Sequence, residues 1–260
     1  MQRSSTYIIG FATAVCLVCG VVVATSAVAL KDRQEANALL DRRMKVLVVA
    51  GIMKEGEKLA PAKITELFES RIKPRLVDMQ TGTFVEQGDL DPTTYEPSDA
   101  AKDPTKSYDP GPNKAKVKRV PNVHIVYQVM EGEKSIMLVL PVEGKGLWST
   151  LYGYLALGPD SDTIKGLTFY QHGETPGLGG EVDNPKWKAL WPGRDAFDDE
   201  WKPAIKVTKG RAGTVEEAPH EVDGLSGATI TANGVTYLLR FWLGEQGFGP
   251  FLANLRKGST

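Results

Sequence analysis

The hydrophobic pattern of the chain begins with one long apolar stretch. Residues 7–30, YIIGFATAVCLVCGVVVATSAVAL, carry no charged side chain. As a helix rising about 1.5 Å per residue, the stretch extends roughly 36 Å, enough to cross the hydrocarbon core of a bilayer. The small-x-small sequence Ala27-Val28-Ala29 leaves a cleaved signal peptide as the alternative, but the stretch far exceeds the usual ~7–15-residue core of such a peptide. We therefore predict a retained transmembrane helix at residues 7–30, after a short tail at residues 1–6.

Helical periodicity continues beyond this stretch. The apolar positions that follow at intervals of three to four residues are Ala36, Leu39, Leu40, Met44 and Leu47. This spacing predicts that the helix continues to near Gly51. A second helix is predicted over residues 60–73. Pro74 stops it, and its apolar face consists of Ile64, Leu67, Phe68 and Ile72. Residues 31–86 are therefore interpreted as a helical segment.

The middle of the chain changes from polar to β-rich. Residues 87–119 are polar and proline-rich, cannot bury much apolar surface, and predict a surface excursion. After them, VHIVYQVM at 123–130 and SIMLVLPVE at 135–143 predict a hairpin. Residues 148–158 and 163–171 predict two more strands, and residues 204–207 a fifth.

The last long element is an amphipathic helix. Val235, Leu238, Leu239 and Trp242 lie on one face, and Gly244 ends the helix. A short helix or turn is predicted at 184–193. Together these elements predict an α+β fold, an antiparallel sheet packed by helices, with one N-terminal transmembrane helix. Residues 31–260 are interpreted as one domain whose core is 120–260.

Composition excludes several functions. The 31 basic and 32 acidic residues balance to a formal net charge of −1, so nucleic acid is not an expected partner. The chain has neither a phosphate-binding P-loop nor a G-x-G-x-x-G nor a G-x-S-x-G motif, and its three histidines are scattered. No catalytic residue and no metal site are predicted. Both cysteines, Cys16 and Cys19, lie within the apolar stretch, so no disulfide is possible within the domain.

A hydroxyl-rich corner precedes the last helix. Residues 223–234, DGLSGATITANG, place Ser226, Thr229 and Thr231 around Gly227 and Ala228. The exposed amides and positive dipole end of a helix N-terminus suit a phosphate, and small neighbours allow close approach. The alternative is that one of these hydroxyls merely caps the helix.

Two glycine-rich loops at strand ends accompany the corner. They are GKGLWST at 144–150 and HGETPGLGGE at 172–181. Leu147, Trp148 and Leu178 are expected to form apolar walls for a flat ring. The three stretches together predict a ligand with a phosphate end and an aromatic end.

The motifs DGLSGATIT, HGETPGLGGE and GLWS, with GFGPFL near the C-terminus, resemble the C subunit of the sodium-translocating NADH:quinone oxidoreductase. The D-x-x-S-G-A-T pattern is shared with the G subunit of the Rnf electron-transport complex. The resemblance implies FMN linked through its phosphate to Thr229 by a flavin transferase that splits FAD, with Asp223 as a recognition residue for that enzyme. It further implies FMN contacts from Leu147, Trp148, Ser149, Glu174, Thr175, Leu178, Gly179, Ser226, Gly227 and Ala228.

The resemblance also implies a function. The chain would be a membrane-anchored flavoprotein that relays electrons, received from NADH through iron–sulfur and iron centres, to the flavins of the B subunit and on to quinone, while the complex pumps Na⁺. Partners would be the B, D, E and F subunits, and the chain alone would not oxidise NADH. Lys202, Lys206 or Lys209 would stabilise the reduced flavin if one lies near it; the alternative for each is a solvated strand edge.

The sequence leaves alternatives for the membrane topology and for the class of protein. Arg3 precedes the apolar stretch and several basic residues follow it, so the positive-inside rule alone places the domain in the cytoplasm. The resemblance instead implies a single-pass protein of the cell inner membrane with a periplasmic flavin domain. The G subunit of an Rnf-type complex is the nearest alternative, although GLWS and the long insertion before Val123 favour the C subunit of the sodium-translocating enzyme. A tethered phosphate- or peptide-binding module without a redox role is the alternative of a different class.

Overall fold

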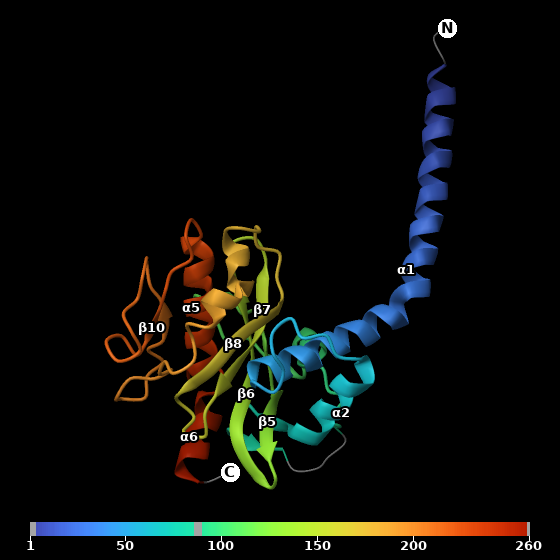
Figure 1. Ribbon diagram of the computed structural model, residues 1–260. Coiled ribbons are helices and arrows are strands. Elements are labelled where there is room, and N and C mark those ends of the chain that lie inside the picture. The colour runs from blue at the N-terminus through green and yellow to red at the C-terminus, as the bar shows by residue number, and fades with distance from the viewer. Residues whose placement is uncertain (1–3, 86–89, 259–260) are drawn as a thin grey trace. The chain divides into compact units, whose positions relative to one another are not determined.

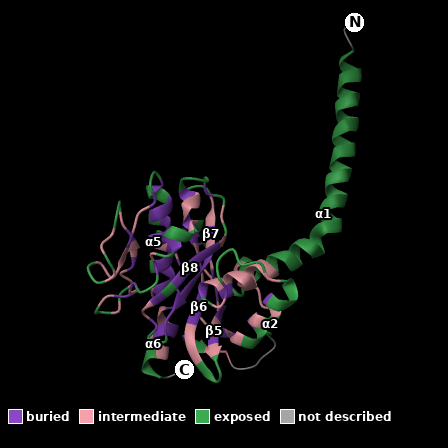
Figure 2. Ribbon diagram, viewed as in Figure 1, coloured by how far each residue is buried: buried purple, intermediate pink, exposed green. Residues whose placement is uncertain are grey.

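The structure is a computed structural model that describes residues 4–85 and 90–258. The chain divides into two units, Met1–Arg42 and Arg43–Thr260. Helix α1 (Ser5–Val49) runs through the first unit and ends in the second. Its N-terminal part contains an 18-residue window of mean hydropathy 2.5, none of which is buried (Figure 2). By length and composition this helix is a candidate membrane span. Residues 1–3 of the predicted tail lie outside the described residues.

The second unit is built on a six-stranded antiparallel sheet in the order β2-β1-β5-β6-β7-β8. Figure 1 labels β5, β6, β7 and β8 of this sheet. Its strands are β1 (Ile72–Asp78), β2 (Thr83–Phe84), β5 (Val123–Glu131), β6 (Lys134–Lys145), β7 (Thr150–Leu157) and β8 (Ile164–Gln171). The four β-rich runs of the sequence form β5 to β8, because short connections let each run pair with the next. The predicted α+β class and antiparallel sheet are confirmed.

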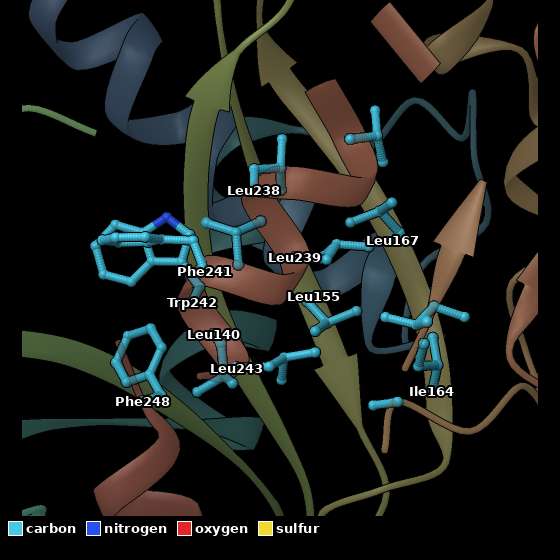
Figure 3. Packing of buried hydrophobic residues seen from close by; sticks show 14 of the residues in the cluster. Leu140, Leu155, Ile164, Leu167, Leu238, Leu239, Phe241, Trp242, Leu243 and Phe248 are labelled. Carbon is cyan, nitrogen blue, oxygen red and sulfur yellow. The ribbon is translucent and has the colours of Figure 1, made fainter. Parts of the chain in front are cut away.

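Helix α5 (Thr229–Leu243) packs on one face of this sheet and makes the main core (Figure 3). The predicted apolar face is buried, with Leu238 and Leu239 at 0% exposure. Trp242 Nε1 donates to the Glu143 carbonyl oxygen of β6 at 2.8 Å. Helix α6 (Gly249–Lys257) follows and adds Phe251 to the core. The position of α5 fixes its N-terminus beside the loops that leave β6 and β8.

The opposite face of the sheet is covered by the last turns of α1 and by α2 (Pro61–Arg71). In α1, Val46, Leu47 and Val49 are buried. The Phe68 ring of α2 meets Tyr127 of β5 edge-on, at 6.0 Å between centroids. Because strand residues alternate between faces, Tyr127 lies opposite the α5 side, to which Val126 contributes. The sheet is therefore buried on both faces.

Strand β1 corrects the helix predicted over residues 60–73. Helix α2 ends at Arg71, and Ile72 begins a strand that pairs with β5 along its whole length. Pro74 lies within this strand rather than stopping a helix. Among the residues that the structure describes, β5 is the one strand that pairs with Pro74, and proline is tolerated where a strand has a partner on one side.

Other segments also differ from the sequence pattern. Of the predicted strand at 204–207, only Lys206–Val207 form β9, which pairs in parallel with β10 (Glu221–Val222) outside the main sheet. The polar segment that follows the undescribed residues 86–89 contains α3 (Pro97–Lys102) and β3 (Ser107–Tyr108), which pairs with β4 (Val120–Pro121). Ala115 and Val117 of this segment belong to the core, a packing that its composition did not indicate.

Candidate functional site

The carboxylate of Glu174 joins the three loops that the sequence singled out. Glu174 follows β8 and is 5% exposed. Its Oε2 accepts from the backbone amide of Leu147 at 3.1 Å, and its Oε1 accepts from those of Trp148 at 2.9 Å and Ser149 at 3.1 Å. The Thr231 hydroxyl of α5 donates to Oε2 at 2.5 Å. One carboxylate therefore holds the β6–β7 loop, its own loop and the first turn of α5 together.

These contacts also set the charge of the site. Burial acts to raise the pKa of Glu174, but the hydrogen bonds from Thr231 and the three amides outweigh it and leave the pKa below its usual value. Glu174 is therefore an ionised carboxylate whose oxygens are occupied by protein donors.

Glycines in two loops allow the loop backbones to lie close to the Glu174 carboxylate and the Thr231 hydroxyl. A Cβ at Gly146 would lie 2.6 Å from Glu174 Oε1, and one at Gly179 would lie 2.6 Å from the Thr231 hydroxyl oxygen. Any side chain at either position would push the loops apart. The glycine-rich sequences are thus explained by the closeness of three backbones around one carboxylate.

Further hydrogen bonds fix the β8 loop. The Gly173 amide donates to the Ser149 hydroxyl oxygen at 2.6 Å, and the Glu174 amide donates to His172 Nδ1 at 3.2 Å. The other ring nitrogen of His172, Nε2, lies 2.7 Å from an Asp183 oxygen. The Thr175 carbonyl oxygen closes the turn by accepting from the amides of Leu178 and Gly180. No sequence pattern had indicated the His172–Asp183 pair.

The two threonines of the corner at the start of α5 lie in different environments. Thr229 is the first residue of the helix and is exposed, whereas Thr231 is fully buried and bound to Glu174. Ala228 is the N-cap residue, and within the described chain no side chain makes a capping hydrogen bond to this helix. The capping alternative for Ser226, Thr229 and Thr231 is therefore wrong. Ser226 is exposed, as is Gly227, which adopts a positive φ of 70°.

Asp223 is fixed at the base of the corner. One oxygen of its carboxylate accepts from the Ala212 amide at 2.8 Å, and its carbonyl oxygen accepts from Trp187 Nε1 at 2.8 Å. These bonds give Asp223 a loop-forming role.

A small hollow of about 50 Å³ lies beside Thr229. Its lining comes from two loops and the first turns of α5, namely Thr208, Lys209, Gly210, Gly224, Leu225, Thr229, Ala232 and Asn233. Of the three lysines considered from the sequence, Lys209 is the one that lines the hollow. Lys206 pairs with Glu221, and Lys202 pairs with Glu200.

Exposed apolar side chains gather around the same corner. Leu147 is 43% exposed, Trp148 66%, Leu178 44% and Ile230 59%. Among the described residues of the second unit, Leu90 is the only other large apolar side chain that is exposed. A Cβ at Gly227 would lie 2.9 Å from Leu178 Cδ2, so Leu178 lies against the corner. The sequence analysis did not predict a role for Ile230 in the site. Its position as an apolar residue beside Thr231, in the first turn of α5, could have indicated one.

The comparisons with known proteins agree with this geometry. Residues 146–244, which contain most of the loop at 144–150 and all of the loops at 172–181 and 223–234, match the model of the FMN-binding domain. The fold and the site therefore define a flavoprotein of the FMN-binding class, attached to a candidate membrane span.

Full-length relatives identify the family. The chain is 48% identical to the C subunit of the Na(+)-translocating NADH-quinone reductase of Vibrio campbellii, over 96% of this chain and 95% of the relative. It is 49% identical to that of Pseudomonas aeruginosa, over 100% of this chain and 99% of the relative. The crystal structure of Shewanella oneidensis NqrC matches with a TM-score of 0.76 and 36% identity, covering 85% of this chain and 99% of that one. The chain belongs to the family of the C subunit of the Na(+)-translocating NADH-quinone reductase.

Family membership confirms the resemblance identified in the sequence motifs. The protein is an FMN-binding, membrane-associated subunit of an oxidoreductase complex, and the Vibrio campbellii and Pseudomonas aeruginosa relatives both carry the name of the NADH-quinone reductase.

Proposed function

We propose that the protein carries FMN covalently, through a phosphodiester to Thr229, and relays electrons between other subunits of the reductase. The observation that carries this proposal is the contrast between the two threonines. Thr229 is exposed at the start of α5, lines the same hollow as Lys209, and is followed by the exposed apolar residue Ile230. Thr231 is buried and its hydroxyl is already used by Glu174.

The phosphate end of FMN fits the first turn of α5. Ala232 is the first amide to bond back along the helix, to the Ala228 carbonyl oxygen at 3.0 Å, so the amides of residues 229–231 have no partner within the helix. These amides and the helix dipole favour an anion at this end. A phosphodiester keeps one negative charge, which Lys209 is placed to balance.

The ring of FMN fits the exposed apolar side chains. Leu147, Trp148, Leu178 and Ile230 lose water-exposed apolar surface when a flat ring covers them, and such burial is favourable by about 25 cal/mol per Å². We assign the remaining contacts to exposed or backbone groups of the same loops: Ser149, Thr175, Gly179, Ser226, Gly227 and Ala228. Glu174 holds these loops in place, since its oxygens are occupied by protein donors.

Attachment is a phosphoryl-group transfer from FAD. The Thr229 hydroxyl oxygen bonds to the FMN-side phosphorus while the bond from that phosphorus to the bridging anhydride oxygen breaks. AMP leaves, and the hydroxyl proton passes to a base of the transferase; no atom is oxidised or reduced. The exposure of Thr229 and Ser226 leaves room for this second enzyme, and Asp223 helps to present the corner to it.

The bound flavin supplies one- or two-electron redox chemistry, and the chain positions it and adjusts its potential. Electrons enter from NADH through other subunits, and we propose the B, D, E and F subunits as partners. We place the anchor at residues 7–30, the FMN-binding domain at residues 31–260, and this domain on the periplasmic side of the inner membrane, where the transferase works. The protein alone does not oxidise NADH.

The test is co-expression with a flavin transferase, followed by denaturing electrophoresis read by flavin fluorescence. Thr229→Ala is expected to abolish the fluorescent band. Thr231→Ser is the matched control, because it keeps a hydroxyl two residues away, and it is expected to keep the band. A fluorescent Thr229→Ala band would exclude Thr229 as the acceptor. Wild-type protein without flavin would exclude the covalent flavin itself and leave the non-redox binding module.

A further inference from the structure

Glu174 and Thr231 lie directly beneath the corner that presents Thr229. We infer that their hydrogen bond is a clasp that assembles the flavin site before any flavin is attached, and that it thereby positions Thr229 for the transferase. This inference rests on the proposed attachment at Thr229. It makes Glu174 and Thr231 positioning residues, since their polar groups contact each other and the loop backbones rather than the reacting atoms.

The clasp is tied closely to the acceptor. Thr231 follows Thr229 by two residues within one helical turn, so a shift of Thr231 moves Thr229 with it. The Thr231 side chain is fully buried and donates to Glu174 at 2.5 Å. The start of α5 is thereby fixed to the β8 loop, and through the same carboxylate to the amides of Leu147, Trp148 and Ser149.

All the atoms of this clasp belong to the protein. The phosphate-binding amides and the acceptor hydroxyl lie at the start of α5, and most of the apolar wall lies on the β6–β7 loop and the β8 loop. The clasp is the hydrogen-bonded junction that these three segments share. Without the Thr231 hydroxyl, a buried carboxylate loses one of its four donors, which is unfavourable and loosens the junction. Holding reacting groups in position beforehand speeds a transfer reaction, because less ordering remains to be done when the partners meet.

A matched control is present on the same helix. Thr236 is also buried, at 6% exposure, and its hydroxyl donates to the Ala232 carbonyl oxygen and accepts from the Val207 amide at 2.9 Å. Thr236→Val therefore removes a buried hydroxyl from α5 without touching the clasp. Thr231→Val makes the same chemical change within it.

The experiment measures the rate at which purified transferase and FAD label the full-length, detergent-solubilised protein, with separate kcat and KM. Thr231→Val is expected to lower kcat/KM at least tenfold, and Thr231→Ser to restore it to within threefold of wild type. Thr236→Val is expected to label at the wild-type rate even when its melting temperature falls as much as that of Thr231→Val. Flavin that does attach to Thr231→Val is expected to show lower fluorescence anisotropy than in wild type.

Two results would overturn the clasp. One is labelling of Thr231→Val within threefold of wild type; the other is an equal loss of rate in Thr236→Val at matched melting temperature. If Thr231→Val does not fold, the labelling rate of Glu174→Asp is compared with that of Thr231→Ser. Glu174→Asp keeps the negative charge but has a shorter side chain. Slow labelling of Glu174→Asp supports the clasp, and labelling at the wild-type rate excludes it. Wild-type protein that fails to label on Thr229 would instead exclude the proposed attachment itself.

Discussion

Replacing Thr231 by alanine is expected to destabilise the domain far more than replacing Thr229. The Thr231 hydroxyl is buried and bonded to an ionised carboxylate, and hydrogen bonds to charged groups contribute about 1.5–3 kcal/mol. We therefore expect Thr231→Ala to lower the free energy of unfolding by about 2–3 kcal/mol. A helix-capping threonine would cost only about 1 kcal/mol. Thr229→Ala, at an exposed position without a cap contact, is expected to change it by less than about 0.5 kcal/mol.

Urea unfolding of the solubilised protein, followed by tryptophan fluorescence, measures this difference. All five tryptophans lie between residues 148 and 242, so the signal reports the flavin domain. With a slope of about 2 kcal/mol per molar urea, the Thr231→Ala midpoint should fall by about 1 M. Midpoints within about 0.3 M of each other for Thr231→Ala and Thr229→Ala would refute the reasoning, because the buried hydrogen bond would then contribute nothing.

Four further outcomes are expected. Trp148→Ala and Leu178→Ala should shift the absorption spectrum and reduction potential of the attached flavin without removing it; an unchanged spectrum and potential in both would return these residues to ordinary surface. Burial lowers the pKa of His124 to about 4 from the usual 6.5, so the unfolded chain binds more protons between these values and stability should fall as pH falls through that window. Urea midpoints measured from about pH 7 to about pH 4.5 should show less of this fall in His124→Leu, and equal slopes in both proteins would contradict the assignment. N-terminal sequencing of membrane-extracted protein should find the anchor retained, and a chain starting near Leu30 would contradict this. A reporter that is active only outside the cytoplasm, fused after Thr260, should be active, and a silent reporter would contradict the periplasmic placement.

Local pattern was sufficient for the elements that pair with chain neighbours. Strands β5 to β8 follow one another through short connections, and α5 shows its apolar face along its length, so both were predictable. Strand β1 was not predictable, because its partner β5 begins at Val123, far along the chain. In addition, the apolar residues up to Ile72 keep the spacing of a helix. Pro74 was interpreted as a helix stop because its pairing with Tyr127 of β5 is a tertiary feature that local spacing does not show.

The site shows the same division. Glycine-rich loops and the hydroxyls of the corner can be predicted from the sequence, since turns and helix starts have local signals. The role of Glu174 cannot, because a glutamate in a polar loop is usually solvated, and its burial depends on three segments meeting. Thr229 and Thr231 likewise look equivalent in sequence and become distinct when the helix is placed on the sheet.

The chemical position of the flavin tests the central claim most directly. Trypsin releases one peptide that ends at Arg240 and contains Asp223, since the chain has no lysine or arginine between residues 212 and 239. Fragmentation mass spectrometry of this peptide, from denatured protein matured with a competent transferase, is predicted to place FMN on Thr229. FMN on Thr231 or Ser226, or an unmodified peptide, would contradict the account.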